Sequence, residues 1–169
     1  MSELSEFRKE KDEFFKYHPH APLTPEQRTS FKGLKYYLEN PRLRYEVDVQ
    51  EHSKKEIVEM ITSTGTLQKY RRYGQFEFQV EGQTHILQVY RDLEGGHFFL
   101  PFIDTTAGQE TYETGRYLEI ERLSNGKYQV DFNYAYNPYC AYNDYWTCPI
   151  PPAENRLKVR IQAGEKKYK

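Results

Sequence analysis

QFEFQVEGQTHILQVY, residues 75–90, gives the clearest indication of the fold class. Polar and apolar residues alternate without error over its first six positions, which is the period of a β-strand with one buried face. Glu81-Gly82 then predicts a tight turn, and residues 85–90 predict the returning strand. The segment therefore predicts an antiparallel hairpin.

Further short strands flank this hairpin on both sides. Residues 56–62, 66–73, 97–102 and 157–161 are the other predicted strands, with Gly-marked turns between neighbouring segments. Short strands at this spacing favour sequential antiparallel pairing over β-α-β units. We therefore predict a mainly β protein, an antiparallel meander closing into a barrel or sandwich, as a single domain over residues 1–169.

The first 33 residues follow a helical pattern instead. Residues 3–17 place apolar side chains near one face, as in an amphipathic helix. In Thr24-Pro25-Glu26-Gln27, Thr24 is the expected N-cap, and Gln27 completes a capping box that starts a second helix. We expect one or two helices, within segment 1–33, to cover a sheet of the β domain at 42–169.

The composition limits the classes of function. The 169 residues include 16 Tyr and 10 Phe, which suit either a core built from rings or the lining of a pocket. A net charge of −1 speaks against nucleic-acid binding, which needs a concentrated basic surface. The one basic cluster, residues 69–73, is interpreted as a solvated strand end.

No segment has the apolar length of a signal peptide or a membrane span. We therefore expect a cytoplasmic chain whose partner is an unidentified small molecule, with no nucleic acid and no membrane among its partners. A homo-oligomer stays open.

A second hairpin, residues 116–133, predicts which side chains share a face. A three-residue Ser-Asn-Gly loop, with Gly126 in the left-handed region, sets Arg122 opposite Tyr128 and keeps apolar residues together on one face. A slip of one residue would mix polar and apolar side chains on both faces. The apolar pattern therefore favours the three-residue loop, which also places Leu118 opposite Phe132.

The same register places Glu119 beside Asp131 on the polar face, where directly opposed like charges are unfavourable. Two interpretations remain open. A wet outer face would screen the charges, whereas a cavity lined by this face would raise the pKa of one carboxylate and make it an acid or base. Arg116, beside this pairing, could neutralise either carboxylate or bind an anion.

Three later stretches are too rich in polar, aromatic and turn residues to be simple strands, and loops of this kind often carry binding groups. They are PFIDTTAGQETYETGRYLEI (101–120), DFNYAYNPYCAYNDYWTCPIPPAENRL (131–157) and IQAGEK (161–166). Together with FRKEKDEFF (7–15) and FKGLKYY (31–37), they resemble domain-of-unknown-function family 1684 over nearly the whole chain. The resemblance marks the region of a site but implies no activity.

The positions that match the family's pattern concentrate in the second half of the chain. They are Asp104, Gly108, Thr111, Tyr112, Gly115, Arg116, Tyr117, Asp131, Asn133, Tyr136, Asn137, Pro138, Cys140, Cys148, Pro151, Pro152, Asn155, Gly164 and Glu165.

Three hypotheses about function remain open. The first is a small-molecule-binding barrel with an aromatic pocket, whose ligand is anionic if Arg116 anchors it. The second is a hydrolase- or lyase-type enzyme with Asp131 or Asp104 as acid or base. The third is a protein-interaction module that uses the Tyr-rich loop 134–146. The candidate ligand-binding residues are Arg116, Tyr112, Tyr117, Asn133, Tyr136, Asn137, Cys140 and Asn155.

Most of these candidates also have a plainer explanation. Asp and Asn side chains commonly hydrogen bond to loop backbone, and Arg116 could form a structural salt bridge with Asp104 or Asp131. No glycine-rich phosphate loop, Gly-x-Ser-x-Gly elbow or dinucleotide fingerprint is present in the sequence, which removes the commonest enzyme classes.

Cys140 and Cys148 are the two cysteines, and seven residues separate them, which is wider than a zinc-knuckle pair. A zinc site would need a third ligand such as His97, and no histidine lies within residues 104–166 to activate a thiol. We therefore predict inert thiols, or an occasional disulfide after oxidation, with no metal and no cofactor.

Overall fold

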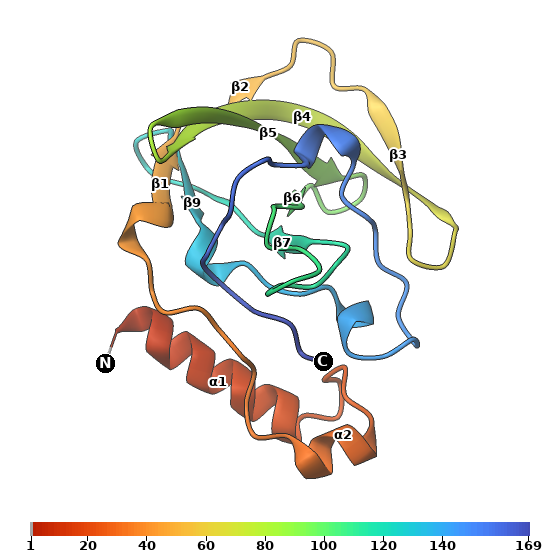
Figure 1. Cartoon of the computed structure of the whole chain (residues 1–169). Coiled ribbons are helices and arrows are strands. Elements are labelled where there is room, and N and C mark those ends of the chain that lie inside the picture. Colours follow the sequence, from red (N-terminus) through yellow and green to blue (C-terminus); the bar gives the residue numbers. More distant parts are fainter. Residues whose placement is uncertain (1) are drawn as a thin grey trace.

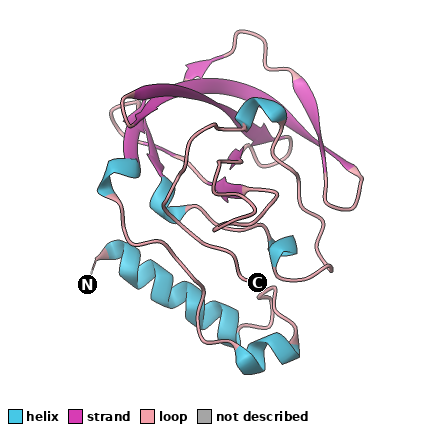
Figure 2. Ribbon diagram, viewed as in Figure 1, coloured by secondary structure: helices cyan, strands magenta, loops and turns pink. Residues whose placement is uncertain are grey.

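Two antiparallel sheets form the body of the computed structural model, which describes residues 2–169 (Figures 1 and 2). The larger sheet has the order β2 (Gln50–Glu51), β4 (Leu67–Val80), β5 (Gln83–Asp92), β6 (Phe98–Phe102), β7 (Arg116–Leu118), with β3 (Ile57–Ile61) also paired to β4. The smaller sheet has the order β1 (Arg44–Val47), β9 (Tyr128–Asp131), β8 (Glu121–Arg122). The prediction of a mainly β, antiparallel protein is confirmed, but neither sheet closes into a barrel within the described residues.

The hairpin predicted over residues 75–90 is the pair β4–β5. Val80 pairs with Gln83 around a turn in which Glu81 and Gly82 both have positive φ, at 52° and 81°. Such φ values match the right-handed twist of the two strands. β4 runs for 14 residues without a break, because the irregularity at Gly74 is a bulge and not a turn.

Both sheets bury their apolar faces in one core. Phe76 and Leu87 of the long hairpin are fully buried there, together with Phe102 of β6 and Val130 of β9. The intervening residue Glu77 is exposed, as the alternation predicts. Burial of these faces supplies the main stabilisation of the sheets.

The loop of the second hairpin is confirmed. Gly126 has φ 85°, Arg122 pairs with Tyr128, and the neighbouring positions pair in the same register. The predicted pairing of Leu118 with Phe132 is wrong, however. Leu118 pairs with Leu100 on β6, while Phe132 starts the 3-10 turn η2 (Phe132–Tyr134). The two arms of the hairpin therefore separate before these residues can pair.

The strand predicted over residues 157–161 is also wrong. This segment belongs to an extended C-terminal strap, residues 156–167. Isolated bridges such as Ile103 with Arg156, single backbone hydrogen bonds such as Thr105 with Val159, and side chains join it to other segments. Ile161 donates its amide to the Asp104 side chain, and its carbonyl accepts from Arg116. Side chains therefore satisfy backbone groups that a sheet ladder would otherwise use.

The two N-terminal helices begin where the sequence predicts. α1 spans Glu3–Tyr17, and α2 spans Pro25–Ser30 behind a complete capping box. Neither helix covers a sheet as expected. Phe15 of α1 packs with Tyr142 and the segments around α2 in a second small core, and Figure 1 shows loops and the strap between α1 and the pair β4–β5. No helix within residues 2–169 has the length and apolarity to cross a membrane.

Three further 3-10 turns complete the described elements. They are η1 (Pro41–Leu43), η3 (Tyr139–Ala141) and η4 (Ala153–Asn155).

The packing of the strap can be tested with a matched pair of glycines. Gly164 and Gly126 have φ values of 82° and 85°, but a Cβ at Gly164 would lie 2.7 Å from the Ala135 carbonyl oxygen, and a Cβ at Gly126 would meet nothing within 4 Å. Gly126→Ala should lower the free energy of unfolding by about 1 kcal/mol through backbone strain alone. Gly164→Ala should lower it by roughly 2 kcal/mol more through steric overlap. Urea denaturation measures both, and equal losses would show that the strap does not pack closely on residues 132–135.

Candidate functional site

Arg116 lies in the interior of the protein. Its side chain is fully buried, and its guanidinium donates to the carbonyl oxygens of Ile161 (2.9 Å), Ala163 and Glu165 (3.3 Å). It also pairs with Asp104 at 3.4 Å. Burial lowers the pKa of Arg116, and the neighbouring Asp104 carboxylate opposes that shift. Both terminal nitrogens bind the strap. Arg116 therefore forms a structural salt bridge with Asp104, which was the alternative to ligand binding.

Asp104 is equally enclosed, with 3% of its surface exposed. One carboxylate oxygen accepts from the Ile161 amide at 2.6 Å, and the Thr106 hydroxyl lies within 2.9 Å of both oxygens. Thr106 in turn bonds to Thr111 at 2.8 Å. This carboxylate therefore shapes the loop after β6 and is not exposed to a substrate.

The buried asparagines hold loop backbone. Asn155 accepts from the Gln88 amide at 2.8 Å and donates to the carbonyls of Gln88 and Pro101. Asn133 makes the same two-way contact with the backbone of Asn40, at 2.8 and 2.9 Å. These contacts join segments that lie far apart in the sequence.

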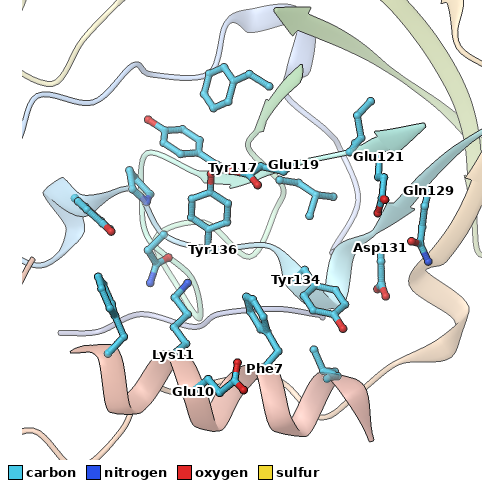
Figure 3. Close-up of a pocket in the computed structure, with 18 of the residues that line it drawn as sticks. Phe7, Glu10, Lys11, Tyr117, Glu119, Glu121, Gln129, Asp131, Tyr134 and Tyr136 are labelled. Atoms are coloured by element: carbon cyan, nitrogen blue, oxygen red, sulfur yellow. Dashed lines mark hydrogen bonds between the residues drawn. The ribbon is translucent and has the colours of Figure 1, made fainter. Parts of the chain in front are cut away.

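A groove opens between α1 and the polar face of the second hairpin (Figure 3). We call it the α1 groove. Its volume is about 1710 Å³, and it is partly open to solvent. Lining side chains include Phe7, Glu10 and Lys11 from the helix and Tyr117, Glu119, Glu121, Asp131, Tyr134 and Tyr136 from the opposite side.

Carboxylates dominate the charge of the α1 groove. Seven acidic residues line it, against two basic ones, Lys11 and Arg44. Lys11 is paired with the buried Glu165, and Arg44 with Asp131 at 2.9 Å and Glu39 at 2.7 Å. Both positive charges are therefore neutralised by carboxylates of this protein.

The predicted pairing of Glu119 with Asp131 is wrong, because β8 begins at Glu121 and Asp131 pairs with Arg44 of β1. The two carboxylates have different surroundings. Glu119 is exposed at the groove, where it accepts a hydrogen bond from Tyr136 at 3.4 Å. Asp131 is buried, and its oxygens bind Arg44 and Asn133. Arg44 therefore neutralises the charge of Asp131, and solvent screens the charge of Glu119. The polar face borders an open groove rather than a closed cavity.

Aromatic rings form a continuous row along the wall of the α1 groove. The ring of Tyr136 lies 5.9 Å from Tyr117, Tyr117 lies 4.8 Å from Phe99, and Phe99 stacks on Tyr70 at 5.2 Å. Burial raises the pKa values of Tyr117 and Tyr136, so both phenols are neutral hydrogen-bond donors at physiological pH. Such rings offer both apolar surface and cation–π contact.

The structure divides the predicted site residues into separate groups. Tyr117, Asp131, Tyr136 and Asn137 line the α1 groove. Arg116, Asp104, Asn133 and Asn155 lie in the interior, and Tyr112 lies beside Cys140 at 3.7 Å, away from the groove lining.

Sequence reasoning gave α1 no role at the site, and it named Glu165 only as a position that matches the family's pattern. Glu165 is 2% exposed, pairs with Lys11 and accepts hydrogen bonds from the Tyr142 hydroxyl at 2.8 Å and the Asn137 amide at 3.2 Å. Phe7 is 43% exposed beside the groove. The lysine in the middle of the FRKEKDEFF segment was an available signal, since the resemblance includes that segment.

No three His, Cys, Asp or Glu side chains within residues 2–169 converge to hold a metal ion. Cys140 and Cys148 are both free thiols.

The fold and groove define an antiparallel β protein with an N-terminal helix set apart from its sheets. The family model described as "Protein of unknown function (DUF1684)" matches residues 29–166, and the chain belongs to this family. It is similar to an uncharacterized protein of Haloarcula marismortui whose solution structure was solved by NMR. The two are 39% identical, with a TM-score of 0.73, over 96% of this chain and 91% of that one. No curated protein matches the chain significantly.

The structural role of Arg116 predicts a large effect on stability. Arg116→Met leaves Asp104 charged and unpaired in the interior, and should lower the free energy of unfolding by about 3–5 kcal/mol. Arg160→Met removes an exposed pair with Glu110 and should cost no more than about 1 kcal/mol. Chemical denaturation of both variants measures the difference, and a loss near 1 kcal/mol for Arg116→Met would contradict the assignment.

Proposed function

We propose that the α1 groove binds a small organic ligand, and that this ligand is a cation with an aromatic or apolar body. The proposal is supported by one observation above the others. Ten aromatic and seven acidic side chains line the groove, while both of its basic side chains are already paired. A row of rings beside unpaired carboxylates is complementary to a positively charged, partly apolar molecule.

Free carboxylates are available on both sides of the groove. Within residues 2–169, Glu6 and Glu10 of α1 and Glu119 and Glu121 opposite form no ion pair. Their negative potentials add in the space between them, which favours a cation over an anion. An anionic ligand would need a free positive group, and Arg116 is enclosed by the strap.

Lys11 makes cation–π contacts of the same kind within the protein. The Lys11 ammonium lies 5.0 Å from the ring centre of Tyr136 and 5.8 Å from that of Phe15. An ammonium or quaternary ammonium ligand would meet similar rings farther along the groove. The full volume of about 1710 Å³ exceeds that of a usual small-molecule pocket, roughly 300–1,000 Å³, so the ligand occupies part of it.

The part of the groove that we assign to the ligand is the region around Glu119. Here a free carboxylate, the phenol of Tyr136 and the ring of Tyr117 lie together. Figure 3 shows this cluster on the side facing α1.

The other two hypotheses have less support. The oxygens of Asp131 and of Asp104 all have hydrogen-bond partners, so no particular observation favours acid–base catalysis. In the loop 134–146, Tyr142 is buried, and Tyr145, at 84% exposed, is the most accessible aromatic side chain. We therefore do not propose either function.

The ligand class can be tested with two probes of opposite charge. Benzyltrimethylammonium should raise the thermal unfolding midpoint in a concentration-dependent way, and phenylacetate should not, because the groove repels an anion. The effect should weaken as salt rises, since exposed charges are screened. Equal stabilisation by both probes would contradict the proposal.

Variants of the carboxylates locate the site. Glu119→Gln/Glu121→Gln should weaken the affinity for benzyltrimethylammonium about tenfold, which corresponds to about 1.4 kcal/mol. Glu13→Gln/Glu59→Gln removes the same amount of charge away from the groove lining and should leave the affinity nearly unchanged. Titration calorimetry measures both, and equal affinities for the two double variants would place the cation elsewhere.

A further inference from the structure

Cys140 and Cys148 lie against each other. Cys148 also lines the α1 groove, but neither cysteine is part of the cation site assigned to the region around Glu119. Cys140 sits in η3, and its backbone amide donates to the Cys148 sulfur at 3.4 Å. Cys148 is fixed by Ser63, whose hydroxyl oxygen accepts from the Cys148 amide at 3.1 Å and whose amide donates to the Cys148 carbonyl at 2.9 Å. The loop between the two cysteines therefore brings both thiols to one place.

Hydroxyl and thiol donors surround the Cys140 sulfur. The Tyr112 hydroxyl, from the loop after β6, lies 3.7 Å from it. The Cys148 thiol and the Ser63 hydroxyl are the other groups that favour a thiolate at this position. A phenol that can donate to the sulfur stabilises a thiolate without a histidine base.

The pKa values of the two thiols are shifted in opposite directions. The hydrogen bond from Cys148, followed by the other donors, lowers the pKa of Cys140 to about 6 against the effect of burial. The same hydrogen bond, together with burial, raises the pKa of Cys148. Burial also raises the pKa of Tyr112 to about 12, so this phenol keeps the proton that it donates. The two shifts therefore favour a thiolate on Cys140, the more exposed sulfur, over one on Cys148.

Exposure assigns the order of reaction. Cys140 is partly exposed, whereas Cys148 is buried, with 8% of its surface accessible. An accessible thiolate beside a sheltered thiol is the arrangement that thiol–disulfide exchange requires, because the first attacks and the second resolves.

We propose that Cys140 and Cys148 form a thiol–disulfide exchange site whose substrates are low-molecular-weight disulfides. The Cys140 thiolate attacks one sulfur of the substrate, the substrate's S–S bond breaks, and one thiolate leaves. Cys148 gives its proton to that leaving group and attacks the Cys140 sulfur, which releases the second substrate thiolate. The protein pair is oxidised to a disulfide, and one substrate disulfide is reduced to two thiols.

The structure also explains why the second step follows the first. The chief cause of the raised pKa of Cys148 is its hydrogen bond to the Cys140 thiolate. Once Cys140 carries the substrate group, that charge is gone. Cys148, whose sulfur already accepts from the Cys140 backbone amide, can then ionise more readily.

The first test uses the reduced wild-type chain and iodoacetamide. Alkylation of Cys140, followed by peptide mass, should reach half its maximal rate near pH 6 in the folded protein and near the usual thiol value of about 8.5 in urea. Tyr112→Phe should move the folded midpoint upward, and Tyr145→Phe, a change at an exposed tyrosine, should not. A folded wild-type midpoint near 8.5 overturns the proposal.

The second test uses oxidised glutathione at pH 7. Wild type should lose two hydrogens as it forms the internal disulfide, Cys148→Ala should stop at a single glutathione adduct on Cys140, and Cys140→Ala should stay unmodified. An adduct on Cys148, or a stable mixed disulfide in wild type, overturns the assignment. The wild-type result alone decides the case if a variant does not fold, and none of these outcomes depends on the α1 groove.

Discussion

The fully buried guanidinium of Arg116 organises the interior of this protein. An ion of this kind is costly to remove from water unless its donors find partners. Here the strap carbonyls of Ile161, Ala163 and Glu165 accept from the two terminal nitrogens, and Asp104 supplies the balancing charge. The Nε atom has no partner among the described residues. The same contacts satisfy backbone groups of the strap, so this segment can remain extended in the interior without joining a sheet.

The position of the strap determines where the helix and the groove lie. Glu165, buried next to the carbonyls that hold Arg116, pairs with Lys11 of α1 and accepts from Tyr142 in the second core. The helix is therefore fastened to the strap and not to a sheet face. Because α1 stands off from the second hairpin, the polar side of that hairpin, with Glu119 and its neighbouring rings, borders an open groove.

Patterns formed by residues that are adjacent in the sequence predicted the local structure well. Strict alternation from residue 75, the capping box at Thr24 and the loop ending at Gly126 all depend on neighbouring residues, and all were found. The strap could not be predicted in this way, because Arg116 and Ile161 lie 45 residues apart and a contact between side chain and backbone leaves no period in the sequence. For the site, the sequence shows which residues are charged or aromatic but not how deeply each one is buried. Burial is what distinguishes Arg116, in the interior, from the tyrosines that line the groove.

Native-state hydrogen exchange at the Ile161 amide tests whether the network around Arg116 holds the fold together. This amide donates to Asp104 at 2.6 Å inside the network that encloses Arg116. If that network holds the fold together, this amide should exchange only when the protein unfolds globally, with the same opening free energy as the most protected amides of β4 and β5. Exchange of Ile161 at a much lower free energy, while β4 and β5 stay protected, would show that the strap detaches by itself and would contradict the account.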